Sequence, residues 1–167
     1  QAAGSSIRPV HMLFTRRSVL RGSRWPAGPP PSPCRPHRSM LQKKGEAVGM
    51  LPDQVPSGGE GVWALAFGQP AYTMTLPARL VHATQAKIIL ALGVRIPFRG
   101  FRLELYPGPS QLSQDPVEAA TQVNNAIETL IMQKPGQYYW GYERFKLPKG
   151  YIGEVPTASS IASQSTQ

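Results

Sequence analysis

The chain has 167 residues, of which 41% are hydrophobic, so it is long enough for one domain of ordinary size. Its single cysteine, Cys34, excludes an internal disulfide and a cysteine-based zinc site. No apolar run approaches the roughly 18 residues of a membrane-spanning helix, the best being residues 88–94.

The net charge of +9 lies almost entirely in the first 40 residues. That segment holds seven arginines and no acidic residue, whereas residues 41–167 hold eleven basic and nine acidic residues. A positive charge of this size suggests an anionic partner such as nucleic acid, phospholipid or an acidic carrier protein. Because residues 41–167 carry a net charge of only +2, a nucleic-acid-binding function loses most of its support there.

Residues 1–40 form a basic, proline-rich segment that does not resemble the rest of the chain. Residues 25–38 have no helical or strand periodicity, and their prolines lack backbone donors. Three explanations remain: a disordered basic arm, a transit-type peptide, or the product of a shifted reading frame. The abrupt change of character at Leu41 favours the last.

Alternating buried strands and helices are predicted from residue 42 onward. The apolar run 47–51, ended by Pro52, predicts a strand buried on both faces, as in a parallel sheet. A glycine-rich loop at 56–61 follows, and then a helix over residues 72–83. Residues 88–92 predict a second buried strand.

A half-exposed strand and a long helix are predicted next. Phe101, Leu103 and Leu105 alternate with polar residues, which is the period of a strand with one buried face. Asp115 is a good N-cap for a helix over Pro116–Gln133, with Glu118 completing a capping box. The helix carries one apolar stripe, made of Ala120, Val123, Ile127, Leu130 and Ile131.

The predicted fold class is α/β, with a partial layered sheet and flanking helices. Three strands are too few for a sheet covered on both faces, so we expect part of the fold to precede this segment. The expected organisation is a basic segment at 1–40, a folded part at 41–150 and a tail at 151–167. The Ser/Thr/Gln-rich residues 157–167 are expected to be disordered.

Candidate chemistry lies at the end of the first predicted strand. Asp53 follows that strand and precedes a flexible loop, a position at which α/β sheets bind ligands. The competing interpretation is that Asp53 caps a turn or accepts hydrogen bonds from backbone donors. None of His11, His37 and His82 has an acidic residue five positions later, and no nucleophile-elbow or P-loop pattern occurs. A self-contained hydrolase or nucleotide enzyme is therefore not expected.

The segment at 137–146 interleaves aromatic residues with two cations. Three interpretations remain open for it: stacking on nucleic acid, insertion at a lipid interface, or packing against the sheet with Arg144 and Lys146 in solvent.

Several stretches together resemble the lipid A biosynthesis acyltransferases, the lauroyl/myristoyl transferase family. Residues 44–54 (KGEAVGMLPDQ) are similar to its strand-and-loop block, and residues 61–68 and 71–75 to the block that follows. Residues 135–146 (PGQYYWGYERFK) are similar to its C-terminal signature. The order and spacing agree across roughly residues 41–150, as expected for the C-terminal half of the enzyme.

The resemblance implies transfer of a fatty acyl group from an acyl carrier protein thioester to a hydroxyl of a lipid A precursor. It implies a membrane surface as partner, at the cytoplasmic face of the bacterial inner membrane, and no metal, nucleotide or other cofactor. In the family, a histidine paired with an acid five residues later deprotonates the acceptor hydroxyl. The resemblance places this motif, a basic block and an anchoring helix before the matched part, and the sequence contains none of them. We therefore expect no catalytic residue in this chain.

Substrate-binding residues are carried over from the matched blocks. Asp53 and Gln54 are expected near the active cleft, with Asp53 organising the acceptor or the site. Arg95 and Pro97, at the end of the second strand, match a weaker block. Three glycines are expected to shape the loop: Gly58, Gly59 and Gly61.

Three functions remain open. The first is an acyltransferase, or part of one, acting on a membrane glycolipid. The second is an inactive module that docks on a membrane or a carrier protein, and the absence of turnover would favour it. The third is a nucleic-acid-binding protein whose arm at residues 8–38 contacts phosphates, and deletion of residues 1–40 would abolish that binding.

Overall fold

The computed structural model describes residues 11–15, 47–56 and 59–164. Within these residues, one antiparallel sheet has four strands in the order β2-β1-β5-β6. The strands are β1 (His11–Thr15), β2 (Ala47–Met50), β5 (Lys87–Ile96) and β6 (Gly100–Pro107). Strands and helices are mixed, which confirms a partial α/β fold.

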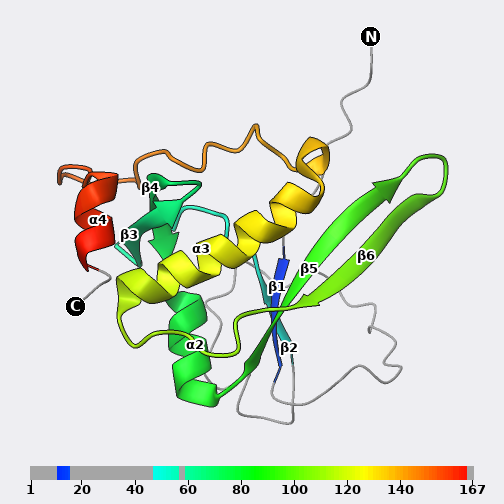
Figure 1. The fold of residues 1–167 in the computed structure, drawn as a ribbon, viewed down its shortest axis with the longest axis horizontal. Coiled ribbons are helices and arrows are strands. Elements are labelled where there is room, and N and C mark those ends of the chain that lie inside the picture. The colour runs from blue at the N-terminus through cyan, green and yellow to red at the C-terminus, as the bar shows by residue number, and fades with distance from the viewer. Residues whose placement is uncertain (1–10, 16–46, 57–58, 165–167) are drawn as a thin grey trace.

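A second, smaller sheet is the hairpin of β3 (Gly61–Ala66) and β4 (Gln69–Met74). Helix α2 (Leu76–Thr84) connects this hairpin to β5, and the long helix α3 (Pro116–Gln133) follows β6. Figure 1 shows α3 running across the molecule, from the β3–β4 hairpin to the four-stranded sheet. The chain ends in a short 3₁₀ turn, η1 (Pro135–Gln137), an irregular segment and helix α4 (Ala158–Gln164).

The core lies between α3 and one face of the sheet. Alternate residues of β5 point to this face, as the period of a strand requires, and the apolar stripe of α3 packs against them. Leu80 of α2 closes one side of the cluster. The main side chains are Ile88, Leu90, Leu92 and Val94 from β5, and Val123, Ile127, Leu130 and Ile131 from α3.

Helix α3 is confirmed with the predicted bounds and the predicted N-cap. Asp115 accepts a hydrogen bond from the backbone N–H of Glu118 at 2.7 Å. The backbone N–H of Asp115 donates instead to Ser113 Oγ at 3.1 Å, so Glu118 does not complete the predicted capping box.

The expected burial of the first strand on both faces is wrong. Strand β2 pairs with β1 alone among the described residues, and its side chains alternate between exposed and half-buried. β2 lies at the edge of the described sheet, where its side chains have a neighbouring strand on one side only. A short apolar run therefore does not by itself predict a strand whose two faces are both buried. Strand β1 lies within residues 1–40, for which the sequence predicted no regular structure.

Two other elements differ from the prediction. The expected helix over residues 72–83 begins only at Leu76, because Tyr72 belongs to β4. The β3–β4 turn places Phe67 and Gly68 at positive φ (49° and 71°), as hairpin turns of two residues require. The tail, expected to be disordered, forms α4, whose Ile161 is 2% exposed.

Strand β6 is confirmed, but its apolar side chains lie on the outside. Phe101, Leu103 and Leu105 are exposed, whereas Glu104 and Tyr106, on the other face of the strand, are half-buried. The alternation of apolar and polar residues correctly predicted a strand, but it did not predict which face of the strand meets the core.

Candidate functional site

Asp53 lies in the turn that follows β2 and is only 5% exposed. The hydroxyl of Tyr138, just after η1, donates a hydrogen bond to Asp53 Oδ2 at 3.1 Å. Gln54, the next residue, is exposed, and its backbone N–H donates to the carbonyl of Leu51 at 3.3 Å. The predicted strand-end carboxylate is therefore turned inward, towards the C-terminal segment.

Tyr138 is held in its neutral form by its surroundings. Burial raises the pKa of the Tyr138 hydroxyl above its ordinary value of 10, and the negative charge of Asp53 raises it further. Burial also lowers the pKa of the Arg144 guanidinium, while the charge of Asp53 acts in the opposite direction. The carboxylate thus has a hydrogen-bond donor and an electrostatic partner, both from the aromatic segment at 137–146.

Arg144 forms the centre of a buried polar network. Its guanidinium donates to the carbonyl of Tyr72 at 2.8 Å and to Thr73 Oγ1 at 2.7 Å, both on β4. A longer bond of 3.3 Å reaches Asn124 Oδ1 on α3. Of the interpretations left open for this segment, the one that put Arg144 in solvent is wrong on that point, because these acceptors replace water around its guanidinium.

Asn124 and Thr73 connect the helix to the hairpin. The side-chain amide of Asn124 donates to the carbonyl of Leu65 at 2.8 Å and to Thr73 Oγ1 at 3.0 Å. The hydroxyl of Thr73 donates in turn to the carbonyl of Ala71 at 3.0 Å. The arrangement fixes the position of Arg144 relative to both α3 and the β3–β4 hairpin.

A second contact ties the loop after β2 to the C-terminal segment. The backbone N–H of Val55 donates to the hydroxyl of Tyr142 at 2.8 Å. Tyr138 and Tyr142 therefore hold the loop at two points, Asp53 and Val55. Two stretches that lie more than 80 residues apart in the sequence form one site.

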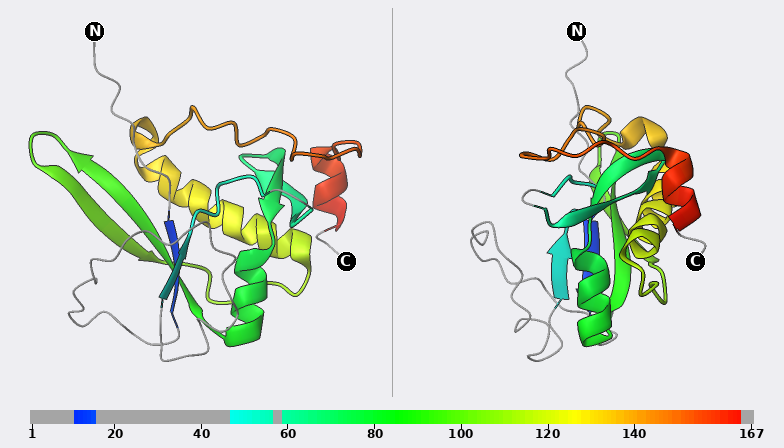
Figure 2. Two further views of the ribbon diagram at one scale, coloured as in Figure 1. Left: turned by 180° about the vertical axis from the view of Figure 1, so that it is seen from behind. Right: turned by 90° about the vertical axis from the view of Figure 1, so that its left-hand side faces the viewer.

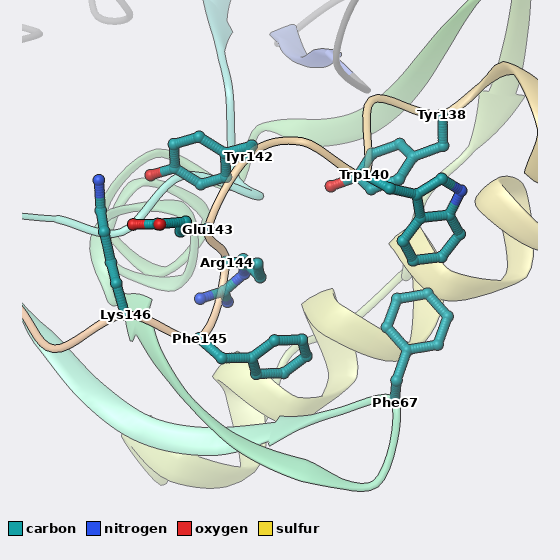
Figure 3. A pocket seen from close by; sticks show the side chains of 8 residues that line it. All are labelled: Phe67, Tyr138, Trp140, Tyr142, Glu143, Arg144, Phe145 and Lys146. Carbon is teal, nitrogen blue, oxygen red and sulfur yellow. The ribbon is translucent and has the colours of Figure 1, made fainter.

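An open pocket of about 530 Å³ lies beside this cluster. Figure 3 shows Phe67 and Trp140 on one side of the pocket and Tyr142, Glu143 and Lys146 on the other. The rings of Phe67 and Trp140 have centroids 5.7 Å apart, and Lys146 Nζ lies 5.0 Å from the centroid of the Tyr142 ring. The complete lining is Phe67, Tyr138, Trp140, Tyr142, Glu143, Arg144, Phe145 and Lys146.

The lining of this pocket is mainly apolar, with a few fixed polar groups. Aromatic side chains form most of the wall, whereas Arg144 is already bound to the protein through Tyr72, Thr73 and Asn124. Ligand pockets in proteins have this character and enclose about 300–1,000 Å³. The site is suited to an apolar group with a polar end near Glu143 and Lys146.

Residues 37–147 match the family model of the bacterial lipid A biosynthesis acyltransferases, which covers well over half of the chain. The chain belongs to this family. Two curated relatives are each 30% identical to it over 106 residues: the lipid A biosynthesis palmitoleoyltransferase of Escherichia coli (strain K12) and the lipid A biosynthesis acyltransferase of Shigella flexneri. The aligned part is 62% of this chain, and the chain spans about a third (35%) of the length of these relatives.

The part that matches the acyltransferase family contains both halves of the site. Asp53 and the pocket segment at 138–146 lie within residues 37–147. The roles predicted for Asp53 and Gln54 in acceptor binding stay predictions. Asp53 is buried and accepts a hydrogen bond from Tyr138, a distant residue in the sequence, so its carboxylate does not face solvent.

Arg95 and Pro97 do not line the pocket. Pro97 lies in the exposed turn between β5 and β6, and the Arg95 side chain is exposed near the end of β5. The backbone of Arg95 is nevertheless tied to the C-terminal segment: Gln137 Oε1 accepts from its N–H at 2.7 Å, and Gln137 Nε2 donates to its carbonyl at 3.3 Å.

The glycine loop is described in part. Gly58 lies outside the described residues, and Gly59 has a φ of 75°, a conformation that favours glycine. Gly61 has no room for a side chain, because a Cβ would lie 2.7 Å from the carbonyl oxygen of Thr73. Gly61 therefore allows the loop to approach β4 closely.

Thr73, Asn124 and Phe67 belong to the cluster and the pocket but were missed by the sequence analysis. Asn124 had a detectable signal, since it is a polar residue that adjoins the apolar stripe of α3. His82, on α2, is half-buried: its Nε2 lies 3.0 Å from the carbonyl of Ser113 and its Nδ1 lies 3.2 Å from the side-chain amide of Gln114.

Among the residues that the structure describes, no group of three or more His, Cys, Asp or Glu side chains is arranged to hold a metal ion. In the same part of the chain, no helix has both the length and the apolar character needed to cross a membrane.

Proposed function

We propose that this chain is part of an enzyme that transfers a fatty acyl group from acyl carrier protein to a lipid A precursor, at the cytoplasmic face of the inner membrane. Its role is to bind the apolar chain of one of these substrates in the pocket beside Asp53. The aromatic pocket carries this proposal, because its wall is mainly apolar and its volume suits a lipid chain. Membership of the family supports the reaction class.

The pocket offers an acyl chain a mainly apolar surface. Trp140 contacts both Phe67 and Tyr138, with ring centroids 5.7 and 5.0 Å apart, so the wall is already assembled. Covering about 50 Å² of such surface contributes on the order of 1 kcal/mol. Lys146 and Glu143 stand together on one side of the pocket, where they offer both charges to a polar headgroup.

Acyl transfer needs a base that this sequence does not provide. The acceptor hydroxyl oxygen bonds to the thioester carbon, the carbon–sulfur bond breaks, and the hydroxyl proton passes to the base while the sulfur leaves. Of the three histidines, none has an acid five residues later. The chain therefore supplies binding and positioning, and the base lies on another part of the enzyme.

A chimera tests this proposal. Residues 37–147 replace the matched segment of the Escherichia coli palmitoleoyltransferase, and acyl transfer is measured from acyl carrier protein to a lipid A precursor. We expect the chimera to be active. The double substitution Trp140→Ser with Phe145→Ser should lower kcat/KM by about tenfold or more, because two apolar walls are lost. Tyr139→Ser is the matched control, since Tyr139 is exposed and does not line the pocket.

Two results contradict the proposal. The first is unchanged transfer by the Trp140→Ser, Phe145→Ser chimera. The second is a chimera with the melting behaviour of the parent enzyme and no turnover. That second result would favour the alternative of an inactive module that docks on membrane or carrier protein, for which the missing histidine–acid pair is the supporting observation.

A further inference from the structure

The β5–β6 hairpin extends away from the body of the molecule (Figures 1 and 2). Its turn, residues 97–99, places Phe98 at a φ of 61° with its side chain fully exposed (109%). A large apolar residue at the tip of a projecting hairpin has no packing role within the described part of the chain. It contributes a surface for something outside that part.

The outer face of the hairpin continues this apolar surface. Phe101, Leu103 and Leu105 follow one another on one side of β6 and are 66%, 56% and 41% exposed. Leu103 of β6 pairs with Gly93 of β5, which has no side chain. Leu103 therefore has no side-chain neighbour at the paired position of β5. The inner face of β5 packs in the core, and on its outer face Ala91, opposite Leu105, is also buried (2% exposed). The exposed apolar surface is therefore made by the side chains of β6 and by the tip.

Three arginines surround the apolar tip. Arg95, Arg99 and Arg102 lie within four residues of Phe98, and all three are exposed. Among the residues that the structure describes, the one ion pair joins Arg102 to Glu104. Arg95 and Arg99 therefore present positive charge close to Phe98 in the sequence, with no contacting carboxylate from the described residues.

The hairpin is held in a fixed direction. The side-chain amide of Gln137 accepts from the backbone N–H of Arg95 at 2.7 Å and donates to its carbonyl at 3.3 Å, much as a neighbouring strand would. This contact is made within four residues of the tip, so Phe98 is presented on a braced support rather than on a free loop.

We propose that the tip of this hairpin docks on an anionic lipid bilayer, with Phe98 and Phe101 in the interfacial region and Arg95 and Arg99 on lipid headgroups. Aromatic residues prefer the headgroup level, and arginines beside them gain from anionic lipid. A second copy of the chain is disfavoured, because two hairpins would bring like charges together. The interaction requires no acyl donor, so lipid binding by the hairpin is tested independently of the proposed acyl transfer.

An environment-sensitive fluorophore locates the contact. In a Cys34→Ser background, the label is attached through Phe98→Cys or, as the control, through Ile152→Cys. Ile152 is 99% exposed and lies far from the hairpin in sequence. With phosphatidylcholine vesicles that contain 30% phosphatidylglycerol, the label at 98 should shift to the blue and be quenched by doxyl lipids. The label at 152 should do neither.

Binding of the full chain to the same vesicles gives the second measurement. Each arginine near an anionic surface is worth about fivefold in binding, so Arg95→Gln with Arg99→Gln should weaken binding by roughly 25-fold. Phe98→Ser with Phe101→Ser should weaken it by about tenfold or more. Lys149→Gln and Ile152→Ser are the matched controls, and all variants share the seven arginines of residues 1–40.

The proposal is overturned if the label at 98 stays in water while the protein is bound to vesicles. It is also overturned if the hairpin substitutions bind vesicles as tightly as the unchanged chain. A blue shift at 98 that grows with protein concentration in the absence of lipid would identify a second copy as the occupant.

Discussion

The hydroxyl of Tyr138 donates to the carboxylate of Asp53 at 3.1 Å, although 85 residues separate them in the sequence. The bond joins the loop after β2 to the C-terminal aromatic segment, and both stretches lie within the part that matches the acyltransferase family. Because the same segment forms most of the pocket wall, the Asp53–Tyr138 contact sets where the pocket lies relative to the loop.

Tyr138→Phe should change how the stability depends on alkaline pH. The pKa of Tyr138 is raised in the folded state, first by burial and then by Asp53, above its ordinary value of 10. Its contribution to stability is complete below pH 10 and is lost at higher pH, as the unfolded chain releases a proton that the folded chain retains. Denaturant unfolding at pH 9 and pH 11 should therefore show a smaller loss of stability for Tyr138→Phe than for the unchanged chain. Equal losses would contradict this.

Arg144→Met should destabilise the fold by about 3–5 kcal/mol, the usual cost of removing one partner from a buried charged network. The carbonyl of Tyr72 and the side chain of Asn124 lose their donor, and Asp53 loses a nearby cation. Arg144→Lys should restore only part of the loss, because an ammonium lacks the forked geometry. Lys146→Met, two residues further on and exposed, is the control and should change stability by less than about 0.5 kcal/mol. Similar effects at both positions would argue against the network.

Two glycine substitutions should have opposite signs. Gly61→Ala places a Cβ 2.7 Å from Thr73 O and from a ring carbon of Tyr72, so we expect a loss of about 1–3 kcal/mol. Gly93→Ala meets nothing within 4 Å and lies inside β5, so a gain of about 0.5 kcal/mol is expected. Melting temperatures of the two variants check the prediction, and a stable Gly61→Ala protein would show that the loop is not packed on β4 as described.

Ile161→Ala tests whether α4 is part of the fold. The side chain is 2% exposed, and its truncation should cost about 2–4 kcal/mol. Ile152→Ala is the matched control, because Ile152 is 99% exposed and should tolerate the change. If both variants unfold at the same denaturant concentration as the unchanged chain, the C-terminal helix does not pack on the remainder.

Local patterns in the sequence predicted the elements that are stabilised locally. Helix α3 has its own N-cap and a continuous apolar stripe, so its bounds and its buried face follow from the sequence. The boundary between β4 and α2 was missed, because Tyr72 is a strand residue only through its pairing with Trp63 on β3. Helix α4 was missed because one buried side chain, Ile161, anchors an otherwise polar segment.

The candidate site was predictable only in part, because local sequence patterns do not show which distant residues come together. A carboxylate at a strand end indicated Asp53, but its partner Tyr138 and the neighbouring Arg144 depend on tertiary contacts. Arg95 was expected to bind substrate because it matched a weaker block of the family. It lies near the far end of an antiparallel hairpin, since β5 runs on to Ile96, and it does not line the pocket. An apolar run shows where a strand begins more clearly than where it ends.

Photocrosslinking tests the central claim, that the aromatic pocket holds a lipid chain. A fatty acyl group that carries a diazirine near its end is loaded on acyl carrier protein. This acyl carrier protein is irradiated together with the 167-residue protein, and the adducts are mapped by mass spectrometry. We predict adducts on Phe67 and on residues 138–146, which decrease when Trp140→Ser and Phe145→Ser are introduced. Adducts confined to other parts of the chain, or unchanged by those substitutions, would contradict the account.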